Sequence, residues 1–171
     1  MATFIKIASV TVGSGGTSSI NFTSIPQTYT DLVIKLSARN QTNTETVGSI
    51  YFNSDTTDGN YRYRRLLGDG SSASSLSGNF PYWFYMSTTA DTASTFGNSE
   101  IYIPNYTGSS QKSISSDVVT ENNATSALTV LTAGLWLDTS AITAIQLRPY
   151  VQGGGNFAQH TTATLYGIKN S

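Results

Sequence analysis

The chain contains no cysteine and only one histidine, His160, among its 171 residues. Without cysteine it can form no disulfide, no Cys-based zinc site and no thiol nucleophile. A single histidine cannot form a cluster of metal ligands. The sequence also has no Gly-x-Ser-x-Gly segment that would place a serine nucleophile on a sharp turn, so we expect no Ser–His arrangement. These absences predict a protein that is not an enzyme and carries no metal or other cofactor.

Charged residues are also scarce. They make up 11% of the chain, with nine basic and ten acidic side chains and a formal charge of -1, against about a quarter in an average soluble domain. Nucleic-acid binding requires clustered Lys and Arg to neutralise phosphates. The chain has no such stripe, and we therefore expect no nucleic-acid partner.

Long apolar runs are missing as well. The longest runs, such as residues 127–137, are interrupted by Thr and Gly and are too short to span a bilayer. Residues 1–7 do not combine a charged region, an unbroken apolar stretch and a cleavage site. We expect no membrane partner, no signal peptide, and a protein that is made and used without secretion.

The chain is rich in hydroxyl side chains, and its apolar and polar residues alternate along the sequence. Its 24 Ser and 25 Thr are about 29% of the residues, and apolar side chains recur at every second position, which is the period of a half-buried strand. β-Branched and aromatic residues dominate these runs, and no helical period persists. Eleven strands are predicted, over residues 4–12, 19–23, 31–39, 49–53, 61–67, 82–86, 100–103, 112–120, 127–137, 142–151 and 162–168.

Gly-rich and Asn/Asp-rich turns separate these runs, as in an all-β antiparallel β-sandwich, and a jelly-roll-like arrangement matches the size best. Residues 41–46 and 68–78 interrupt the rhythm, and we interpret both as long exposed loops. Neither side of these loops is long enough for a core of its own. The sequence therefore predicts one domain over residues 1–171.

The one concentrated basic segment spans residues 61–65, Tyr-Arg-Tyr-Arg-Arg. On a strand it would place Tyr61, Tyr63 and Arg65 on one face and Arg62 and Arg64 on the other. The segment could simply be an outer strand with exposed Arg. We favour contact with the acidic surface of a partner protein, since Arg and Tyr are enriched at interfaces. Arg62, Arg64 and Arg65 are therefore candidate partner contacts.

Five aromatic residues lie within the seven residues 80–86. Because neighbouring strand residues point to opposite faces, both faces of this strand must be aromatic. We expect one face to lie in the core and the other to meet a second subunit or a ligand, with a sugar platform as the alternative. This adds four candidate contacts, Tyr82, Trp83, Phe84 and Tyr85.

Two further patterns have ordinary explanations. Residues 53–60 offer several oxygen ligands suited to calcium, but Asn, Asp and Gly are also what a hairpin turn selects, and we interpret the segment as a turn. Glu45, Glu100 and Glu121 stand singly in the sequence, whereas glycosidase chemistry needs two facing carboxylates.

Residues 18–32, Ser-Ser-Ile-Asn-Phe-Thr-Ser-Ile-Pro-Gln-Thr-Tyr-Thr-Asp-Leu, resemble a segment that recurs in small virion proteins of tailed bacteriophages, notably those of cyanobacteria and marine bacteria. Residues 163–169, Ala-Thr-Leu-Tyr-Gly-Ile-Lys, resemble the closing strand of the same proteins. The two motifs cover about an eighth of the chain, and no functional residues can be transferred with them. The resemblance implies a β-sandwich component of the virus particle, assembled in the host cytoplasm.

Composition and resemblance agree on a structural role. The first expectation is a capsid cement protein that forms a homotrimer and clamps the major capsid protein. The alternative is a tail-fibre module that binds a receptor or a surface glycan. A glycan-degrading enzyme is the third possibility.

Overall fold

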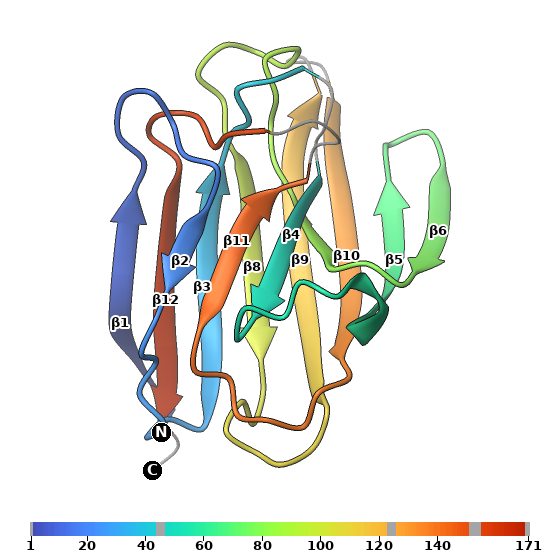
Figure 1. Cartoon of the computed structure of the whole chain (residues 1–171). Coiled ribbons are helices and arrows are strands. Elements are labelled where there is room, and N and C mark those ends of the chain that lie inside the picture. The colour runs from blue at the N-terminus through green and yellow to red at the C-terminus, as the bar shows by residue number, and fades with distance from the viewer. Residues whose placement is uncertain (1, 44–46, 123–125, 151–154, 170–171) are drawn as a thin grey trace.

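Two antiparallel sheets face each other in the computed structural model, which describes residues 2–43, 47–122, 126–150 and 155–169 (Figure 1). The larger sheet has eight strands in the order β1-β12-β3-β8-β9-β10-β5-β6, and the smaller has four in the order β2-β11-β4-β7. The strands are β1 (Thr3–Thr11), β2 (Ile20–Phe22), β3 (Asp31–Ala38), β4 (Val47–Phe52), β5 (Tyr61–Gly68), β6 (Ala73–Gly78), β7 (Tyr82–Tyr85), β8 (Gly97–Ile103), β9 (Lys112–Asn122), β10 (Ser126–Trp136), β11 (Ile145–Pro149) and β12 (Thr162–Lys169).

This architecture confirms the predicted all-β sandwich, while jelly-roll connectivity stays a prediction. The apolar faces of the two sheets meet in a core with an aromatic centre. The ring of Phe52 on β4 lies 5.3 Å from that of Trp136 and 5.4 Å from that of Trp83, centroid to centroid. Such tilted aromatic contacts bury large apolar surfaces between the sheets.

Of the two long loops predicted from the sequence, the one at residues 68–78 is wrong. Residues 68–78 form no long loop, because the chain turns at Asp69 and returns as β6, paired with β5 from Tyr63–Gly78 to Gly68–Ala73. Residues 41–43 do form a bend after β3, and residues 44–46 lie outside the described part of the chain. The only helical turn among the described residues is the 3₁₀-helix η1 (Asp58–Asn60). No described helix has the length and apolar character that crossing a membrane requires.

The registers align side chains into rows across the large sheet. One row on the inner face joins Arg65, Thr132 and Ser116, on strands β5, β10 and β9. The next row lies on the outer face and runs from Leu66 through Leu131, Asp117 and Glu100 to Lys35. The large sheet therefore has one face in the core and one open face on which these residues are neighbours.

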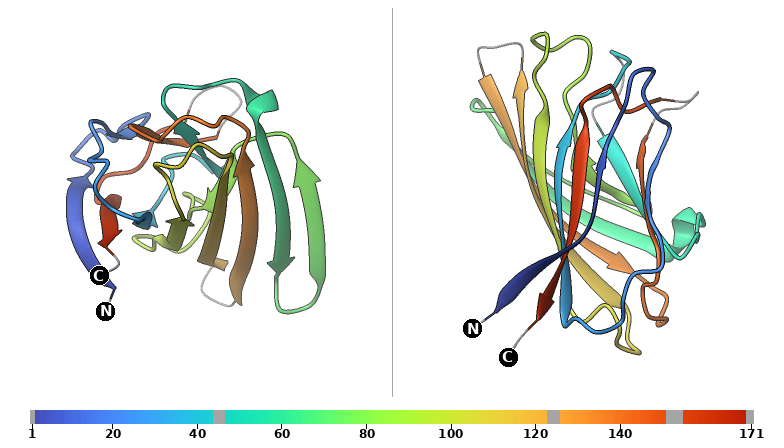
Figure 2. Two further views of the ribbon diagram at one scale, coloured as in Figure 1. Left: turned by 90° about the horizontal axis from the view of Figure 1, so that it is seen from below. Right: turned by 90° about the vertical axis from the view of Figure 1, so that its left-hand side faces the viewer.

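Strands β5 and β6 form a hairpin at one margin of the sandwich. Figure 1 shows the pair beyond β10, and Figure 2 shows it on the side away from both chain ends. Five of the six residues of β6 are exposed. The hairpin thus extends the large sheet past the cover of the small one.

Candidate docking surface

The basic segment 61–65 lies on β5 and has the two faces expected. Tyr61, Tyr63 and Arg65 are buried, whereas Arg62 is partly exposed and Arg64 is exposed. Arg62 donates hydrogen bonds to the carbonyls of Gly59 and Tyr61, at 2.6 and 2.7 Å. Arg64, on the outer face of the large sheet, donates a 3.0 Å hydrogen bond to the carbonyl of Tyr63, while its side chain stays exposed.

Arg65 corrects the expectation that all three arginines point to a partner. Its side chain is 8% exposed, and its Nε and Nη1 have no hydrogen-bond partner among the described residues. The guanidinium carbon lies 5.6 Å from the ring centroid of Tyr63 and 5.0 Å from that of Tyr85. Arg65 is thus held between two aromatic rings, where the cation meets their negative faces.

The aromatic segment of β7 gives a second correction. Trp83 and Phe84 have no exposed surface, and Tyr85 is buried as well, so the chain itself covers the face that was expected to stay open. The pairing of β7 with β4 shifts register between Gly48 and Ser49, which interrupts the strict alternation of faces. Tyr82 alone among the four candidates stays partly exposed.

Glycines make room for these rings. A Cβ on Gly48 would lie 2.0 Å from the ring of Phe84, and one on Gly134 would lie 2.9 Å from the indole of Trp83. The rings therefore pack directly on backbone. Phe84 also stacks on Phe157 with centroids 6.3 Å apart. A closely packed position of this kind leaves no surface for a partner.

The turn at residues 53–60 uses its oxygens within the fold. Asp55 accepts hydrogen bonds from the Trp136 indole (2.9 Å), the Asn60 amide (2.9 Å) and the Thr57 backbone N–H (3.0 Å). Partial burial alone would raise the pKa of Asp55, but these donors outweigh it and lower the pKa below its usual value. The carboxylate thus fastens the turn to β10, in agreement with the interpretation as a turn.

An exposed apolar patch lies on the outer face of the large sheet instead. Leu66 on β5 is 60% exposed, and its cross-strand neighbour Leu131 on β10 is 53% exposed. Val119, on the adjoining strand β9, is 47% exposed. Single exposed apolar residues are normal on a soluble protein, whereas neighbouring ones on a flat face indicate a contact surface.

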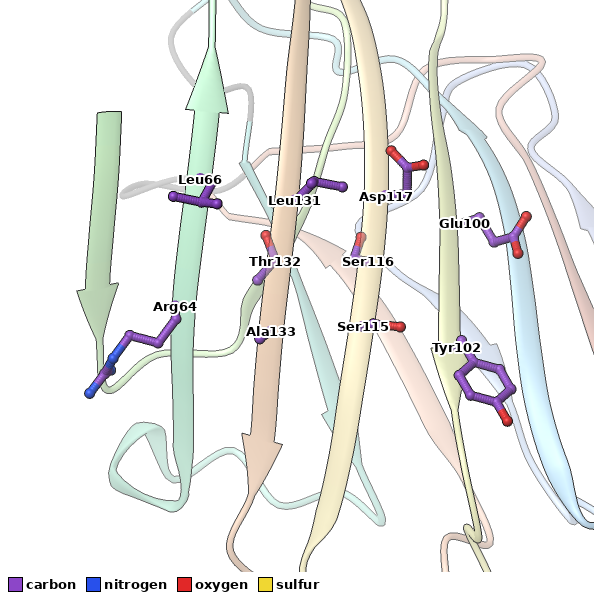
Figure 3. Close-up of a pocket in the computed structure, with 10 residues that line it drawn as sticks. All are labelled: Arg64, Leu66, Glu100, Tyr102, Ser115, Ser116, Asp117, Leu131, Thr132 and Ala133. Atoms are coloured by element: carbon purple, nitrogen blue, oxygen red, sulfur yellow. The ribbon is translucent and has the colours of Figure 1, made fainter. Parts of the chain in front are cut away.

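The patch borders a hollow of about 530 Å³. Figure 3 shows Leu66 and Leu131 on neighbouring strands, with Arg64 to one side and Asp117 and Glu100 to the other. Tyr102 closes the lower rim, and its hydroxyl donates a 2.9 Å hydrogen bond to Asp31. Burial, and then this contact with Asp31, raise the pKa of Tyr102. We call Arg64, Leu66, Leu131, Ala133 and Asp117 the outer-face patch.

Within the outer-face patch, charges of opposite sign lie on either side of the two leucines. Arg64 is exposed on β5, while Asp117 lies two strands away on β9 and has Glu100 directly opposite on β8. Glu100 forms an ion pair with Lys35 on the next strand, and both side chains are about half exposed. The surface can therefore contact apolar, acidic and basic groups of a partner at once.

Of the three glutamates weighed for glycosidase chemistry, Glu100 lies directly opposite another carboxylate, that of Asp117 on β9. Glu121 instead accepts hydrogen bonds from Thr92 and Thr95 and fastens the loop before β8, and Glu45 lies outside the described residues. No group of three His, Cys, Asp or Glu side chains that could hold a metal occurs among the described residues. His160 is exposed in the turn before β12.

Sequence reasoning missed the outer-face patch, although a signal was present. In residues 127–137 the apolar residues occupy both parities, with Val130 and Trp136 at even positions and Leu131 and Leu135 at odd ones. A strand with one wet face needs only one apolar parity. The leucines at odd positions therefore indicated that the open face of β10 is apolar as well.

Comparison with known protein families, with curated proteins and with solved structures finds no match to this chain.

Proposed function

We propose that the chain is a non-enzymatic structural protein of a virus particle, a capsid cement protein that docks on the major capsid protein through its outer-face patch. Two independent features support this. Residues 18–32 and 163–169 resemble segments of phage virion proteins, and the open face of the large sheet presents apolar side chains to solvent. A protein that acts by being bound needs such a surface rather than a catalytic constellation.

The observation that carries the proposal is the exposure of Leu66 and Leu131 side by side. Interfaces concentrate their energy in a few apolar or Arg side chains that lose all solvent on binding. Here two leucines, at 60% and 53% exposure, lie next to Arg64 on a rigid sheet. A capsid surface with an apolar hollow and an acidic rim near Arg64 fits this arrangement.

The test is binding to capsids of the virus that encodes the chain, after their decoration has been stripped. The parent protein should sediment with these heads and saturate at a fixed ratio to the major capsid protein. Leu66→Ser/Leu131→Ser should weaken binding at least tenfold, since two apolar contacts are lost. The matched control is Phe4→Ser/Ile5→Ser, which removes two exposed apolar side chains of β1.

Either of two results would contradict the proposal. The parent chain could fail to bind stripped heads under any salt condition. Alternatively, the Leu66→Ser/Leu131→Ser variant could bind as tightly as the parent, which would show that the surface lies elsewhere.

A tail-fibre module that binds a surface glycan is the second candidate, and a specific observation favours it. Tyr82 on β7 is partly exposed, and its ring contacts those of Phe80 and Tyr150 at centroid distances of 5.1 and 4.3 Å and that of Tyr63 on β5 at 6.0 Å. Phe80 is 40% exposed. Rings with a polar surround can stack on the apolar face of a sugar.

A glycan array separates the two candidates. If the glycan proposal holds, the parent binds a defined sugar and Phe80→Ser abolishes that binding while head binding stays unchanged. If the cement proposal alone holds, the array is blank and the heads bind.

A further inference from the structure

Strand β6 forms a free edge of the large sheet. It pairs with β5 on one side, and no described strand lies on its other side. Residues 73–77 are exposed, and Leu76 keeps 50% of its surface in solvent. A strand in this position presents a row of unpaired backbone N–H and C=O groups to any further strand.

The other three sheet edges carry features that discourage pairing. The register of β1 against β12 shifts between Lys6 and Ala8, and Lys6 is a charge on that edge. β2 has three residues, too few for a stable ladder. β7 has four residues and a register shift against β4. Bulges, charges and short strands are the usual ways in which proteins protect sheet edges.

β6 has none of this protection. Its sequence, Ala-Ser-Ser-Leu-Ser-Gly, has no charge and no proline, and it pairs with β5 without a register shift. The turn that leads into it is fixed, because Asp69 accepts hydrogen bonds from the backbone N–H groups of Ser71 (2.9 Å) and Ser72 (2.7 Å). These backbone bonds, with those of the two serine hydroxyls, lower the pKa of Asp69. The turn is therefore fixed, and β6 follows it as a regular strand whose outer edge pairs with no described strand.

We propose that β6 is a strand-addition site for a second copy of this chain, which pairs its own β6 antiparallel across a two-fold axis perpendicular to the sheet. With such an axis, the outer faces of both copies lie on the same side of the joined sheet. Each residue can then pair only with a partner residue whose side chain points to the same face, so odd-numbered residues pair with odd-numbered ones and even with even. Centring the axis on Leu76 sets it against the partner's Leu76. Ser75 then pairs with the partner's Ser77, and Ser74 with the partner's Gly78.

A second copy is the occupant that fits this edge best. Charged strands repel their own copies, but β6 carries no charge, and its serines and glycine allow the two backbones to approach closely. Pairing also removes from water part of the half of Leu76 that is exposed in each copy. The contact is isologous, so it closes as a dimer and does not give the trimer expected from the sequence.

The dimer would affect how the chain docks on a capsid, although the dimer proposal does not depend on the proposed capsid function. Because the axis is perpendicular to the sheet, the outer-face patches of both copies face the same direction. Two weak contacts on one capsid would then act together, and the second would form at a high effective concentration.

The first test uses the absence of cysteine. Cα atoms of opposite residues in an antiparallel pair lie about 4.5 to 5.5 Å apart, within the range that a disulfide spans. Leu76→Cys should therefore form a covalent dimer under mild oxidation. Leu66→Cys is the matched control, because Leu66 is also exposed, at 60% against 50% for Leu76, but lies on the neighbouring strand away from the axis. Crosslinking of Leu76→Cys no faster than that of Leu66→Cys would overturn the proposal.

The second test uses charge. Analytical ultracentrifugation at low salt should show the parent as a dimer and Ser75→Lys/Ser77→Lys as a monomer, because each Lys would face a Lys of the partner. Mixing this variant with Ser75→Glu/Ser77→Glu should restore a dimer of one copy of each. Thr3→Lys/Thr11→Lys, on the β1 edge, should leave the parent dimer unchanged. Circular dichroism monitors the fold of each variant, and all the substituted residues are exposed.

A parent chain that is monomeric at 100 µM (a value set from typical micromolar dimer affinities), or that is a trimer, would overturn the proposal. So would mixed Lys and Glu variants that remain monomers. These measurements need no capsid, so a failure to decorate heads leaves the dimer standing, and a missing dimer leaves head binding to be judged separately.

Discussion

The guanidinium of Arg65 lies 5.0 Å from the ring of Tyr85 inside the sandwich, and no described carboxylate pairs with it. Its cross-strand neighbours are Thr132 on β10 and Leu76 on β6, and Ser116 on β9 lies next to Thr132 in the same row. The hydroxyls of Thr132 and Ser116 also have no hydrogen-bond partner among the described residues. One polar row thus crosses the core between the two sheets. Buried polar groups without partners are costly, so this row lowers the stability of the fold.

The first prediction follows from that cost. Arg65→Met keeps most of the side-chain volume and removes the unpaired N–H groups, so the free energy of unfolding should stay unchanged or rise by about 1 kcal/mol. Arg65→Ala should lower it by about 2 kcal/mol, because it leaves a cavity between Tyr63 and Tyr85. Urea denaturation of both variants measures the difference. If Arg65→Met costs as much as Arg65→Ala, the charge itself stabilises the fold.

The second prediction concerns the ring of Phe84, which lies over Gly48. A Cβ at position 48 would lie 2.0 Å from that ring, so Gly48→Ala should lower the free energy of unfolding by about 2 to 3 kcal/mol. Adding Phe84→Leu removes ring atoms and should recover part of the loss, so the double variant should be more stable than additivity allows. Strictly additive losses in urea denaturation would show that Phe84 is not the obstacle.

The third prediction is a pH dependence that Asp55 contributes. Hydrogen bonds from Trp136, Asn60 and Thr57 lower the pKa of Asp55 in the folded chain below its ordinary value of 3.8. A lowered carboxyl pKa adds stability above the unfolded pKa, and this contribution is lost as the pH falls through the folded pKa. The stability difference between the parent and Asp55→Asn should therefore be largest near pH 7 and shrink below pH 3.8.

Thermal unfolding of both proteins between pH 7 and pH 2 tests this, over a range set by carboxyl titration. Trp136→Phe, which removes one donor to Asp55, should lose part of the same pH dependence. A difference between parent and Asp55→Asn that does not change with pH would contradict the role of the carboxylate.

How much of the fold is readable from the sequence depends on whether a strand has one buried face. β5 does, and its alternating pattern predicted the correct segment and, for 61–65, the correct faces. β3 was also predicted in the correct segment, although Val33 on its other face is buried as well. β6 has two exposed faces and one large apolar residue, so no alternation marks it, and Ser and Gly favour strands poorly. Its existence depends on pairing with β5, a tertiary contact that composition does not reveal.

The candidate site shows the same limit. Sequence alone identified the aromatic density of residues 80–86 but not the register shift that lets β7 bury both Trp83 and Phe84. It likewise placed Arg65 on the face of Tyr61 and Tyr63 without showing that this face is the core. The outer-face patch combines residues from β5, β9 and β10, and their proximity depends on a strand order that only the structure supplies.

The fourth prediction restricts the basic contribution to two arginines. Because Arg65 is buried, only Arg62 and Arg64 can meet a partner, and exposed charge contacts are weak, about 0.2 to 1 kcal/mol each. Arg62→Ser/Arg64→Ser should therefore weaken head binding only about two- to thirtyfold at low salt, and the difference should fade as salt screens it. Lys6→Ser/Lys169→Ser, which removes two exposed charges elsewhere, is the control. An equal loss in both variants would indicate a nonspecific charge effect.

The last prediction is that the facing carboxylates of Glu100 and Asp117 do not catalyse. The two residues lie directly opposite each other on adjacent strands, where Cβ atoms are about 4.5 to 5.5 Å apart, so their position in the sheet alone does not exclude such chemistry. Their surroundings argue against it. Both lie on the open face of the sheet, Glu100 is bound to Lys35, and a glycosidase needs one carboxyl kept protonated in a sheltered site.

The purified chain should therefore release no sugar from host capsule or cell-wall glycans, and neither Glu100→Gln nor Asp117→Asn should change that. Asp117→Asn should instead raise the free energy of unfolding by about 0.2 to 1 kcal/mol, because it relieves the repulsion between like charges directly opposite each other. Glu100→Gln removes the same repulsion but also the ion pair with Lys35, so its gain should be smaller. Glycan cleavage that either substitution abolishes, with the fold intact by circular dichroism, would replace the structural role with an enzymatic one.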